Sequence, residues 1–205
     1  MTPAPVSGTE GYAAEGEAFI QRAESISFED VHGPVLHLLP GTPCHVLDIG
    51  AGSGRDAAAF AAMGHRVLAV EPVEESRRAG QTLHPAPAIE WLDDHLPDLA
   101  RVRRRGGQFD LVMLIAVWMH LDAERRRQAM PVVASLVRPG GTMIMSLRHG
   151  PVSPGRRMDD VSGAETVALA APCGLRCVLD IATPSALPSN RLAGVTWTRL
   201  AFVRS

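Results

Sequence analysis

Three glycines stand within five positions, at Gly50, Gly52 and Gly54, between two apolar runs. Glycine lets the backbone adopt positive φ and approach a ligand closely, because it has no Cβ. The stretch "HVLDIG" before them is typical of a buried strand, and "RDAAAFAAMGH" after them is typical of a helix. The start of a helix offers unpaired N–H groups and a partial positive charge, which suit a carboxylate or a phosphate. This segment is therefore predicted to hold a ligand through its backbone.

Two acidic residues flank the glycine loop. Asp48 precedes the first glycine by two residues, which places a carboxylate at the mouth of the same cleft. Glu71 ends the next apolar run, "RVLAVEP", about twenty residues further on, where an acid can bind both hydroxyls of a ribose. The loop and the two acids together favour a ligand that contains a nucleoside.

The spacing of the glycines argues against a dinucleotide. The dinucleotide fingerprint is G-x-G-x-x-G, whereas here the third glycine comes one residue early and Arg55 occupies its expected position. Asp48 also suits an ammonium group better than a pyrophosphate. The ligand that this pattern implies has a cationic head and a ribose.

Strands and helices alternate along the chain, and they must position these residues. Apolar runs predict strands at residues 45–50, 66–72, 89–93, 109–119, 142–148, 175–183 and 195–203. Helical patterns occupy residues 55–65, 73–83, part of 94–106, 121–137 and 162–174. The sequence "RPGG" predicts a turn before the fifth strand.

Local signals mark the ends of several helices. Gly64 is expected to close the first helix of the core in a left-handed conformation. Asp122 is a predicted N-cap, and Pro131 predicts a kink or a restart within the same helix. Ser162 and Glu165 form a capping-box pattern.

Alternation of this kind predicts an α/β fold, with right-handed crossovers and helices on both faces of a parallel sheet. The last two strands follow each other without a helix, so one of them should run antiparallel. Ligands on such sheets bind beyond the carboxyl ends of the strands, where the glycine loop leaves the first strand. At 205 residues the chain suits a single domain.

The ordered series "LDIGAGSGR", "VLAVEP", "IEWLDD", "FDLVMLIAVWMHLD" and "LVRPGGTMIMSLR" resembles the motifs of class I S-adenosylmethionine-dependent methyltransferases. The glycine loop and the strand after it are particularly similar to small members such as the tellurite-resistance and thiopurine methyltransferases. The resemblance implies a Rossmann-like, seven-stranded, mostly parallel sheet of order 3-2-1-4-5-7-6, with strand 7 antiparallel. It implies a single domain with an N-terminal helical segment or lid at residues 1–43 and a core at 44–205. The implied cofactor is S-adenosylmethionine, with S-adenosylhomocysteine as product.

The resemblance also implies roles for residues around the loop. The backbone of residues 50–54 would cradle the methionine part, Asp48 would orient the loop or the ammonium group, and Glu71 would take the ribose hydroxyls. An acid in "EWLDDH" would accept from the adenine amine, with Asp93 preferred to Asp94. The residues implied in cofactor binding are Asp48, Gly50, Ala51, Gly52, Ser53, Gly54, Arg55, Glu71, Pro72, Leu92, Asp93, Asp94, Ile115, Ala116 and Val117.

Arg55 has two open interpretations. A cation at a helix start opposes the helix dipole, so Arg55 needs a partner such as Asp56, Glu71 or a ligand carboxylate. A surface ion pair and a contact with the ligand are both compatible with the sequence.

Methyl transfer from a sulfonium is an in-line displacement, for which alignment and exclusion of water supply most of the rate. A general base is needed only if the acceptor arrives protonated. His120 is the candidate for that catalytic role, with a helix-entry cap as its alternative. Substrate-binding residues are expected beyond the strand ends, each with a packing or solvated-loop alternative: Tyr12, Trp118, Met119, Arg148 and His149.

Composition and charge limit the classes of partner, the cellular compartment and the metal sites that we expect. A net charge of −2 gives no attraction to nucleic acid or to a membrane, and the runs "RVRRR" and "ERRR" are interpreted as solvated helix faces. No apolar run is long enough to span a bilayer, and the first residues lack the pattern of a signal peptide. The three cysteines fit neither a disulfide framework nor a zinc site. A cytoplasmic protein without a bound metal is therefore expected.

The sequence thus predicts S-adenosylmethionine-dependent methyl transfer to a small-molecule acceptor, carried out by a monomer or a homodimer. Two alternatives stay open. One is an NAD-type oxidoreductase with an atypical glycine loop, and the other is a non-catalytic S-adenosylmethionine-binding sensor.

Overall fold

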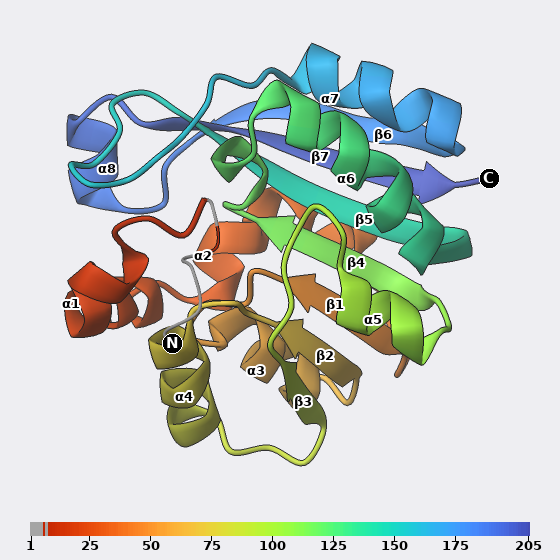
Figure 1. Ribbon diagram of the computed structural model, residues 1–205, viewed down its shortest axis with the longest axis horizontal. Helices are drawn as coiled ribbons and strands as arrows, with labels where there is room; N and C mark the ends of the chain where they lie inside the picture. Colours follow the sequence, from red (N-terminus) through yellow and green to blue (C-terminus); the bar gives the residue numbers. More distant parts are fainter. Residues whose placement is uncertain (1–5, 7) are drawn as a thin grey trace.

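The computed structural model describes residues 6 and 8–205, and their backbone forms one twisted sheet flanked by helices (Figure 1). The strand order is β3-β2-β1-β4-β5-β7-β6, as the resemblance implies. Strands β1 to β5 pair in parallel, and β7 pairs antiparallel with both β5 and β6. The strands are β1 (His45–Ile49), β2 (Arg66–Val70), β3 (Ile89–Leu92), β4 (Phe109–Ile115), β5 (Val137–His149), β6 (Leu175–Pro184) and β7 (Thr196–Arg204).

Helices cover both faces of the sheet. In the view of Figure 1, α5, α6 and α7 lie in front of the sheet, whereas α2 and α3 lie behind it. The α-helices are α1 (Tyr12–Glu24), α2 (Phe28–His32), α3 (Arg55–Ala62), α4 (Glu74–Leu83), α5 (Ala100–Arg105), α6 (Ala123–Leu136), α7 (Gly163–Ala170) and α8 (Pro188–Leu192). Short 3₁₀ helices are η1 (Gly33–Leu38), η2 (Trp118–His120) and η3 (Ala171–Cys173).

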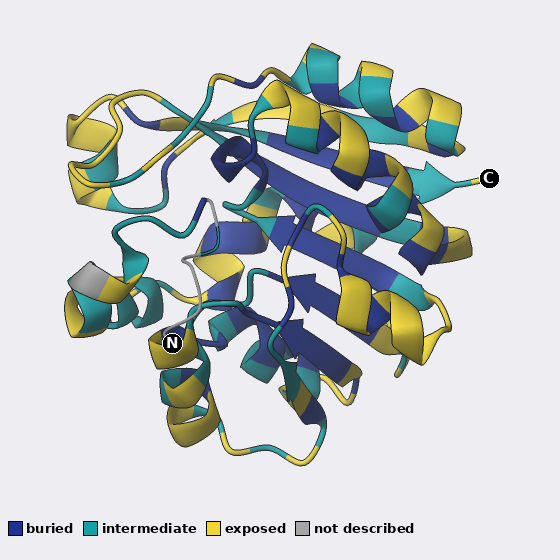
Figure 2. Cartoon of the chain, viewed as in Figure 1, coloured by how far each residue is buried: buried dark blue, intermediate teal, exposed yellow. Residues whose placement is uncertain are grey.

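The core fills both sides of the central strands, which are the darkest part of the molecule in Figure 2. Side chains alternate between the two faces, since successive residues of a strand point in opposite directions. Leu47 and Val112 belong to the cluster that includes residues of α5 and α6. Val46 and Leu111 belong to the cluster that includes residues of α2 and α3. The almost wholly apolar β4 is therefore buried on both faces, as a central parallel strand should be.

The predicted helix ends are largely observed. Gly64 follows α3 with φ +90°. The carboxylate of Asp122 accepts from the Arg125 N–H at 2.9 Å, and the Ser162 hydroxyl accepts from the Glu165 N–H at 3.1 Å. The Glu165 carboxylate does not complete the capping box, because it pairs with Arg126 on α6 at 3.0 Å.

Helix α6 runs through Pro131 as a single element, so of the predicted kink or restart the restart does not occur. One other local expectation was wrong. The "RPGG" segment is part of β5 rather than a turn that precedes it. These residues make the pairing of β5 with β4 irregular, and the register shifts between Phe109 and Leu111.

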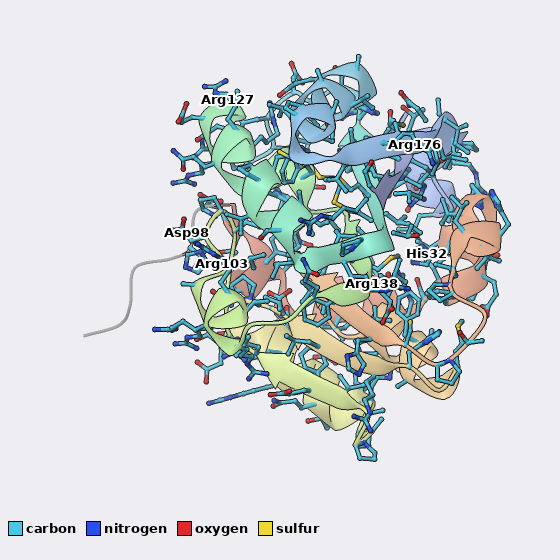
Figure 3. The ribbon with its side chains drawn as sticks, turned by 90° about the vertical axis from the view of Figure 1, so that its right-hand side faces the viewer. His32, Asp98, Arg103, Arg127, Arg138 and Arg176 are labelled. Carbon is cyan, nitrogen blue, oxygen red and sulfur yellow. The ribbon has the colours of Figure 1, made fainter. Side chains whose placement is uncertain are left out.

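The basic runs are mostly solvated, in agreement with their interpretation. Arg103 and Arg127 are exposed and lie at the periphery of the molecule (Figure 3). Arg126 differs, since its side chain is only 3 % exposed and it donates to the carbonyls of Leu121 and Asp160 as well as to Glu165. A guanidinium with these partners connects α6 to α7 and the loop before it.

The described part of the predicted N-terminal segment forms α1, α2 and η1, and residues 1–5 and 7 lie outside the described residues. Helix α1 is interrupted at Gly16, whose φ of 43° and ψ of −116° are not helical. None of the helices in the described ranges combines the length and apolar character that crossing a membrane requires.

Candidate active site

A cavity of about 160 Å³ opens at the carboxyl ends of β1, β2 and β4. Five residues of the N-terminal segment cover one side of it: Val6, Gly8, Thr9, Tyr12 and Phe19. The glycine loop, the end of β2 and the segment after β3 form the other walls. The lining residues are Val6, Gly8, Thr9, Tyr12, Phe19, Ile49, Gly50, Gly52, Val70, Glu71, Pro72, Val73, Ser76, Asp94, His95, Leu96, Ile115, Ala116, Val117, His120 and Leu121.

The three glycines of the loop serve different purposes. Gly50 has φ +75° and its N–H donates to the Val70 carbonyl at 2.8 Å, which ties the loop to β2. A Cβ on Gly50 would lie 2.4 Å from Cγ2 of Val117 on the opposite wall of the cavity. Gly54 faces away from the cavity, and a Cβ there would lie 2.8 Å from the Trp91 ring. The missing Cβ of Gly50 therefore leaves room beside Val117, and that of Gly54 lets the loop pack against Trp91.

Glu71 is the acidic group at the centre of the site, with only 6 % of the residue exposed. Its two carboxylate oxygens accept from the N–H groups of Gly52 and Val73, each at 2.8 Å. Burial raises the pKa of Glu71, and the two backbone hydrogen bonds oppose that rise. The carboxylate is thus held rigidly on the cavity wall, and its lone pairs can accept further hydrogen bonds from hydroxyls.

Asp48 lies in β1 under the loop, only 2 % exposed, and does not line the cavity. Its Oδ2 atom has no hydrogen-bond partner among the described residues. Burial, together with the nearby carboxylates of Asp56 and Glu71, raises its pKa well above the ordinary value, and Arg55 opposes this. A buried carboxylate oxygen without a partner beside the glycine loop is complementary to a cationic ligand.

Arg55 is turned away from the cavity. Its Nε donates to Asp56 at 2.8 Å, and its Nη1 donates to the Ala23 carbonyl of α1 at 3.0 Å. Ser53 also faces α1, since its hydroxyl donates to the Glu24 carboxylate at 2.6 Å. Arg55 thus forms an ion pair with Asp56 and does not line the cavity. Ala51, Ser53 and Gly54 likewise shape the loop without lining the cavity.

The structure reverses the preference between the two acids after β3. Asp94 lines the cavity and is 6 % exposed, and its Oδ2 accepts from the N–H groups of Arg101 and Val102. The side chain of Asp93 is 46 % exposed and pairs with Arg101 at 3.0 Å outside the cavity. Leu92 packs against the core, and Leu96 lines the cavity in its place.

The end of β4 contributes backbone to the site, as expected. Ile115, Ala116 and Val117 line the cavity. Ala116 has φ +60°, a left-handed conformation that residues with a Cβ rarely adopt. The hydroxyl of Ser146 on β5 accepts from the Ala116 N–H at 2.9 Å and holds that conformation.

Trp118 and Met119 are not pocket residues. They are 0 % and 1 % exposed and belong to the core cluster, because η2 turns them inward. Arg148 and His149 lie in a second cavity near the start of α7, and the His149 Nε2 contacts the Thr198 hydroxyl at 2.8 Å. Of the five predicted substrate-binding residues, only Tyr12 lines the first cavity.

His120 and Tyr12, which both line the cavity, contact each other. The Tyr12 Oη lies 2.9 Å from His120 Nε2, and the His120 Nδ1 lies 2.7 Å from the Arg157 carbonyl oxygen. The guanidinium of Arg156 stacks on the Tyr12 ring, with Cζ 3.1 Å from the ring centroid. Arg156 also donates to Glu15 at 2.8 Å. The Tyr12 phenol therefore contacts both the His120 imidazole and the Arg156 guanidinium, and that guanidinium is paired with Glu15.

Sequence reasoning missed part of the lining. Ile49 and Val70 end strands next to predicted site residues, so their positions were accessible from the pattern. Val6, Gly8 and Thr9 carry no recognisable signal, since a segment that packs across the site has no periodicity. The remaining missed residues follow β2, β3 and η2: Val73, Ser76, His95, Leu96 and Leu121.

Among the described residues, no group of three or more histidine, cysteine or acidic side chains is placed to hold a metal ion. Cys44, Cys173 and Cys177 are free thiols. The polar side chains that line the cavity are the carboxylates of Glu71 and Asp94, the imidazoles of His95 and His120, the hydroxyls of Thr9 and Ser76, and the Tyr12 phenol.

The chain is similar to several methyltransferases. Residues 46–141 match the family model described as a methyltransferase domain. The chain is 29 % identical over 151 residues to the ubiquinone biosynthesis O-methyltransferase of Xanthomonas campestris pv. campestris (strain B100), which covers 73 % of this chain. It is 28 % identical over 159 residues to the protein of the same name from Albidiferax ferrireducens. The chain spans 60 % of the length of each of these curated relatives.

Solved structures share the fold. A TehB-like SAM-dependent methyltransferase from Corynebacterium glutamicum superposes with a TM-score of 0.68 at 17 % identity, covering 94 % of this chain and 100 % of that one. The 1,6-didemethyltoxoflavin-N1-methyltransferase of Burkholderia thailandensis, solved with S-adenosylhomocysteine, gives 0.68 at 21 % identity, covering 100 % and 93 %. At these identities the likeness establishes the architecture alone.

Proposed function

The chain carries a class I S-adenosylmethionine-dependent methyltransferase domain, and on that premise we propose that it transfers the donor's methyl group to an oxygen of a small molecule. The curated relatives, at 28 to 29 % identity, are named as O-methyltransferases, which supports an oxygen acceptor. The structural neighbours include N-methyltransferases, so the choice of oxygen rests on sequence rather than on fold.

The observation that carries the proposal is the placement of Glu71. Its carboxylate is buried on the cavity wall, bound to the Gly52 N–H, at the carboxyl end of the second strand. A carboxylate in that position can accept from both hydroxyls of a ribose, and it lies next to a loop that a nucleoside ligand can approach closely.

The rest of the cavity fits the other parts of S-adenosylmethionine. Pro72, Val73 and Leu96 offer apolar contact to an adenine ring, and Asp94 is the acid beside them. Gly50 and the backbone at residues 115–117 are left for the methionine part, with the unpartnered oxygen of Asp48 under the loop. When bound, the cofactor supplies an electrophilic methyl group on a positively charged sulfur.

The protein's own contribution is alignment and exclusion of water. Val6, Gly8 and Tyr12 cover the cavity from the N-terminal side, and α1 is attached to the glycine loop through Ser53 and Arg55. Holding donor and acceptor in line within such an enclosure supplies most of the rate of a displacement reaction. The cover that Val6, Gly8 and Tyr12 form over the cavity supports a small acceptor rather than a macromolecule.

We also propose a cytoplasmic location and a monomeric or homodimeric state without nucleic-acid partners. Three free thiols are compatible with a reducing compartment. The exposed basic side chains Arg105, Arg127 and Arg138 pair with acidic neighbours, which removes the unbalanced positive surface that nucleic acid would need.

Calorimetric titration with S-adenosylmethionine, S-adenosylhomocysteine and NAD tests the proposal. The two sulfur nucleosides are expected to bind at one site per chain, and NAD is not expected to compete. Preferential binding of NAD would overturn the methyltransferase assignment. Binding of S-adenosylmethionine without methyl transfer to any small molecule would instead indicate a sensor.

A further inference from the structure

Tyr12 and His120, which both line the cavity, belong to a short hydrogen-bonded chain. The Tyr12 Oη lies 2.9 Å from Nε2 of His120, whose Nδ1 lies 2.7 Å from the carbonyl oxygen of Arg157. A carbonyl oxygen only accepts, so the proton of a neutral His120 ring is on Nδ1. The Nε2 atom then carries the lone pair, and the Tyr12 hydroxyl donates to it.

The surroundings favour the neutral imidazole. His120 is 8 % exposed, and burial lowers its pKa below the ordinary value of 6.5. The guanidinium groups of Arg156 and Arg148 lower the pKa further, whereas the Arg157 carbonyl and the Glu10 carboxylate oppose the change. At neutral pH the ring is therefore ready to accept a proton at Nε2.

Tyr12 is held between the imidazole and a cation. Arg156 stacks on its ring at 3.1 Å, and the Phe19 ring meets it edge-on with centroids 4.9 Å apart. Burial raises the pKa of the phenol, and Arg156 opposes that rise. The hydroxyl is thus a fixed, uncharged group that can accept one hydrogen bond from the cavity while it donates another to His120.

We propose that Tyr12 and His120 form a proton-accepting pair, and that the methyl acceptor carries an acidic hydroxyl of the phenol or enol type. The inference rests on the proposed methyl transfer and adds the class of acceptor and the path of its proton. The protein's own Tyr12 is an aromatic hydroxyl in these surroundings: its oxygen contacts the His120 imidazole and its ring contacts the Arg156 guanidinium.

The step balances without another reactant. The acceptor O–H donates to the Tyr12 oxygen, while the Tyr12 proton passes to Nε2 of His120. The acceptor oxygen forms its bond to the methyl carbon as the carbon–sulfur bond breaks, and that bonding pair stays on sulfur. The products are the methyl ether, a neutral thioether nucleoside and an imidazolium, which later releases its proton to water.

The chemistry of the pair selects among acceptors. A neutral imidazole with a lowered pKa is a weak base, so it can assist ionisation of a phenol or enol far better than that of an alkyl alcohol. The charge of Arg156, whose guanidinium stacks on the Tyr12 ring, favours an oxygen anion that develops beside the Tyr12 hydroxyl. A thioether or a neutral tertiary amine carries no proton to remove and would leave the pair without a role.

The same contacts could instead serve only to attach the N-terminal segment. Gly8 packs so closely on His120 that a Cβ would lie 2.7 Å from the His120 carbonyl oxygen. A purely structural role predicts a loss of stability or of cofactor affinity when either side chain is changed. A role in proton transfer predicts a change in the pH dependence of turnover, with a dependence on the acidity of the acceptor.

The test uses the full chain, S-adenosylmethionine and three catechols of decreasing acidity: 4-nitrocatechol, catechol and 4-methylcatechol. Wild type, Tyr12→Phe and His120→Gln are compared from pH 5 to 9, with His149→Gln as the control histidine variant. Melting temperature and S-adenosylhomocysteine affinity are measured for each variant, and both are expected to stay close to wild type.

Wild type is expected to methylate the catechols, with kcat/KM falling as His120 becomes protonated, at a pH below the ordinary histidine pKa of 6.5. With 4-methylcatechol, Tyr12→Phe and His120→Gln should lower kcat by ~10²-fold, which is the scale of general base catalysis. The fall of activity at acidic pH should disappear in both variants. With 4-nitrocatechol, which ionises without assistance, both variants should stay within about tenfold of wild type. His149→Gln should keep the profile of wild type.

The outcomes distinguish an error in the acceptor class from an error in the proposed function. If wild type binds S-adenosylhomocysteine but methylates none of the catechols, the acceptor class is overturned and the donor assignment stands. If it does not bind S-adenosylhomocysteine, the proposed function itself fails. If both variants keep the acidic limb, or lose activity equally with all three catechols, the proton-accepting pair is refuted.

Discussion

The carboxylate of Glu71 accepts a hydrogen bond from the backbone N–H of Gly52 at 2.8 Å, which joins the end of β2 to the loop that follows β1. Through this contact an acid that can bind a ribose also fixes the backbone that faces the rest of the nucleoside. The two parts of the site are therefore positioned relative to each other before any ligand binds. Such preorganisation reduces the entropic cost of binding.

Substitution of Glu71 should act mainly on cofactor affinity. Glu71→Ala is expected to weaken S-adenosylhomocysteine binding by about 1.5–3 kcal/mol, or ~10- to 150-fold, as for a lost charge-assisted hydrogen bond. Glu71→Gln keeps one acceptor oxygen for the loop and should show a smaller loss. Calorimetry measures both, and wild-type affinity in Glu71→Ala would refute the ribose assignment.

The two acids after β3 should behave differently. Asp94 lines the cavity, whereas Asp93 is paired with Arg101 outside it. Asp94→Asn is expected to lower S-adenosylhomocysteine affinity by about tenfold, and Asp93→Asn to leave it unchanged. S-inosylhomocysteine, which lacks the adenine amine, should bind wild type and Asp94→Asn equally well. A larger effect of Asp93→Asn would restore Asp93 as the adenine-binding acid.

The buried ion cluster at Asp56 should govern stability in acid. Asp56 lies 2.9 Å from His32 Nε2 and 2.7 Å from Arg55 Nη2. Burial raises its pKa, but His32 and Arg55 more than offset this and lower the pKa to about 2. Because this folded-state pKa is below the ordinary 3.8, the ionised group contributes stability above about pH 4. That contribution is lost as the pH falls towards 2.

Asp56→Asn should therefore lower the free energy of unfolding at pH 7 by about 3–5 kcal/mol, since it leaves the Arg55 guanidinium without its carboxylate partner. Urea unfolding measured at pH 7 and at pH 3 should show a smaller difference from wild type at the lower pH. Asp30→Asn, at an exposed position of α2, is the matched control. A difference that is the same at both pH values would show that Asp56 is not the titrating group.

The N-terminal segment should depend on Gly8. This residue has φ +96°, and a Cβ would lie 2.7 Å from the His120 carbonyl oxygen. Gly8→Ala should release the segment, which hydrogen exchange would detect as faster exchange in residues 8–24 with unchanged exchange in the sheet. Gly33→Ala, where a Cβ meets nothing within 4 Å, is the control. Unchanged protection in Gly8→Ala would show that the segment is held by other contacts.

The architecture was predictable because its signals are local. Apolar runs, caps such as Asp122 and Ser162, and the order of the motifs fixed the strands and their connections. The positions of Glu71 and the glycine loop followed, since the ends of parallel strands meet at one edge of the sheet.

What escaped prediction depends on partners distant in sequence. Arg55 pairs with Asp56, one of the partners that the sequence offered, but its hydrogen bond to the Ala23 carbonyl joins α3 to α1, and no local pattern contains that contact. Trp118 and Met119 face the core because η2 rotates them inward, although an apolar residue after a strand can equally line a pocket. Asp93 and Asp94 are adjacent in the sequence, so which of them faces the cavity depends on the residue at which the four-residue strand β3 ends.

A crystal structure of the chain with S-adenosylhomocysteine tests the central claim most directly. The account predicts one molecule in the cavity, with both ribose hydroxyls on the Glu71 carboxylate, the adenine beside Asp94 and the amino-acid part against the backbone of Gly50 and Gly52. A nucleoside bound elsewhere, or a ribose without contact to Glu71, would contradict it.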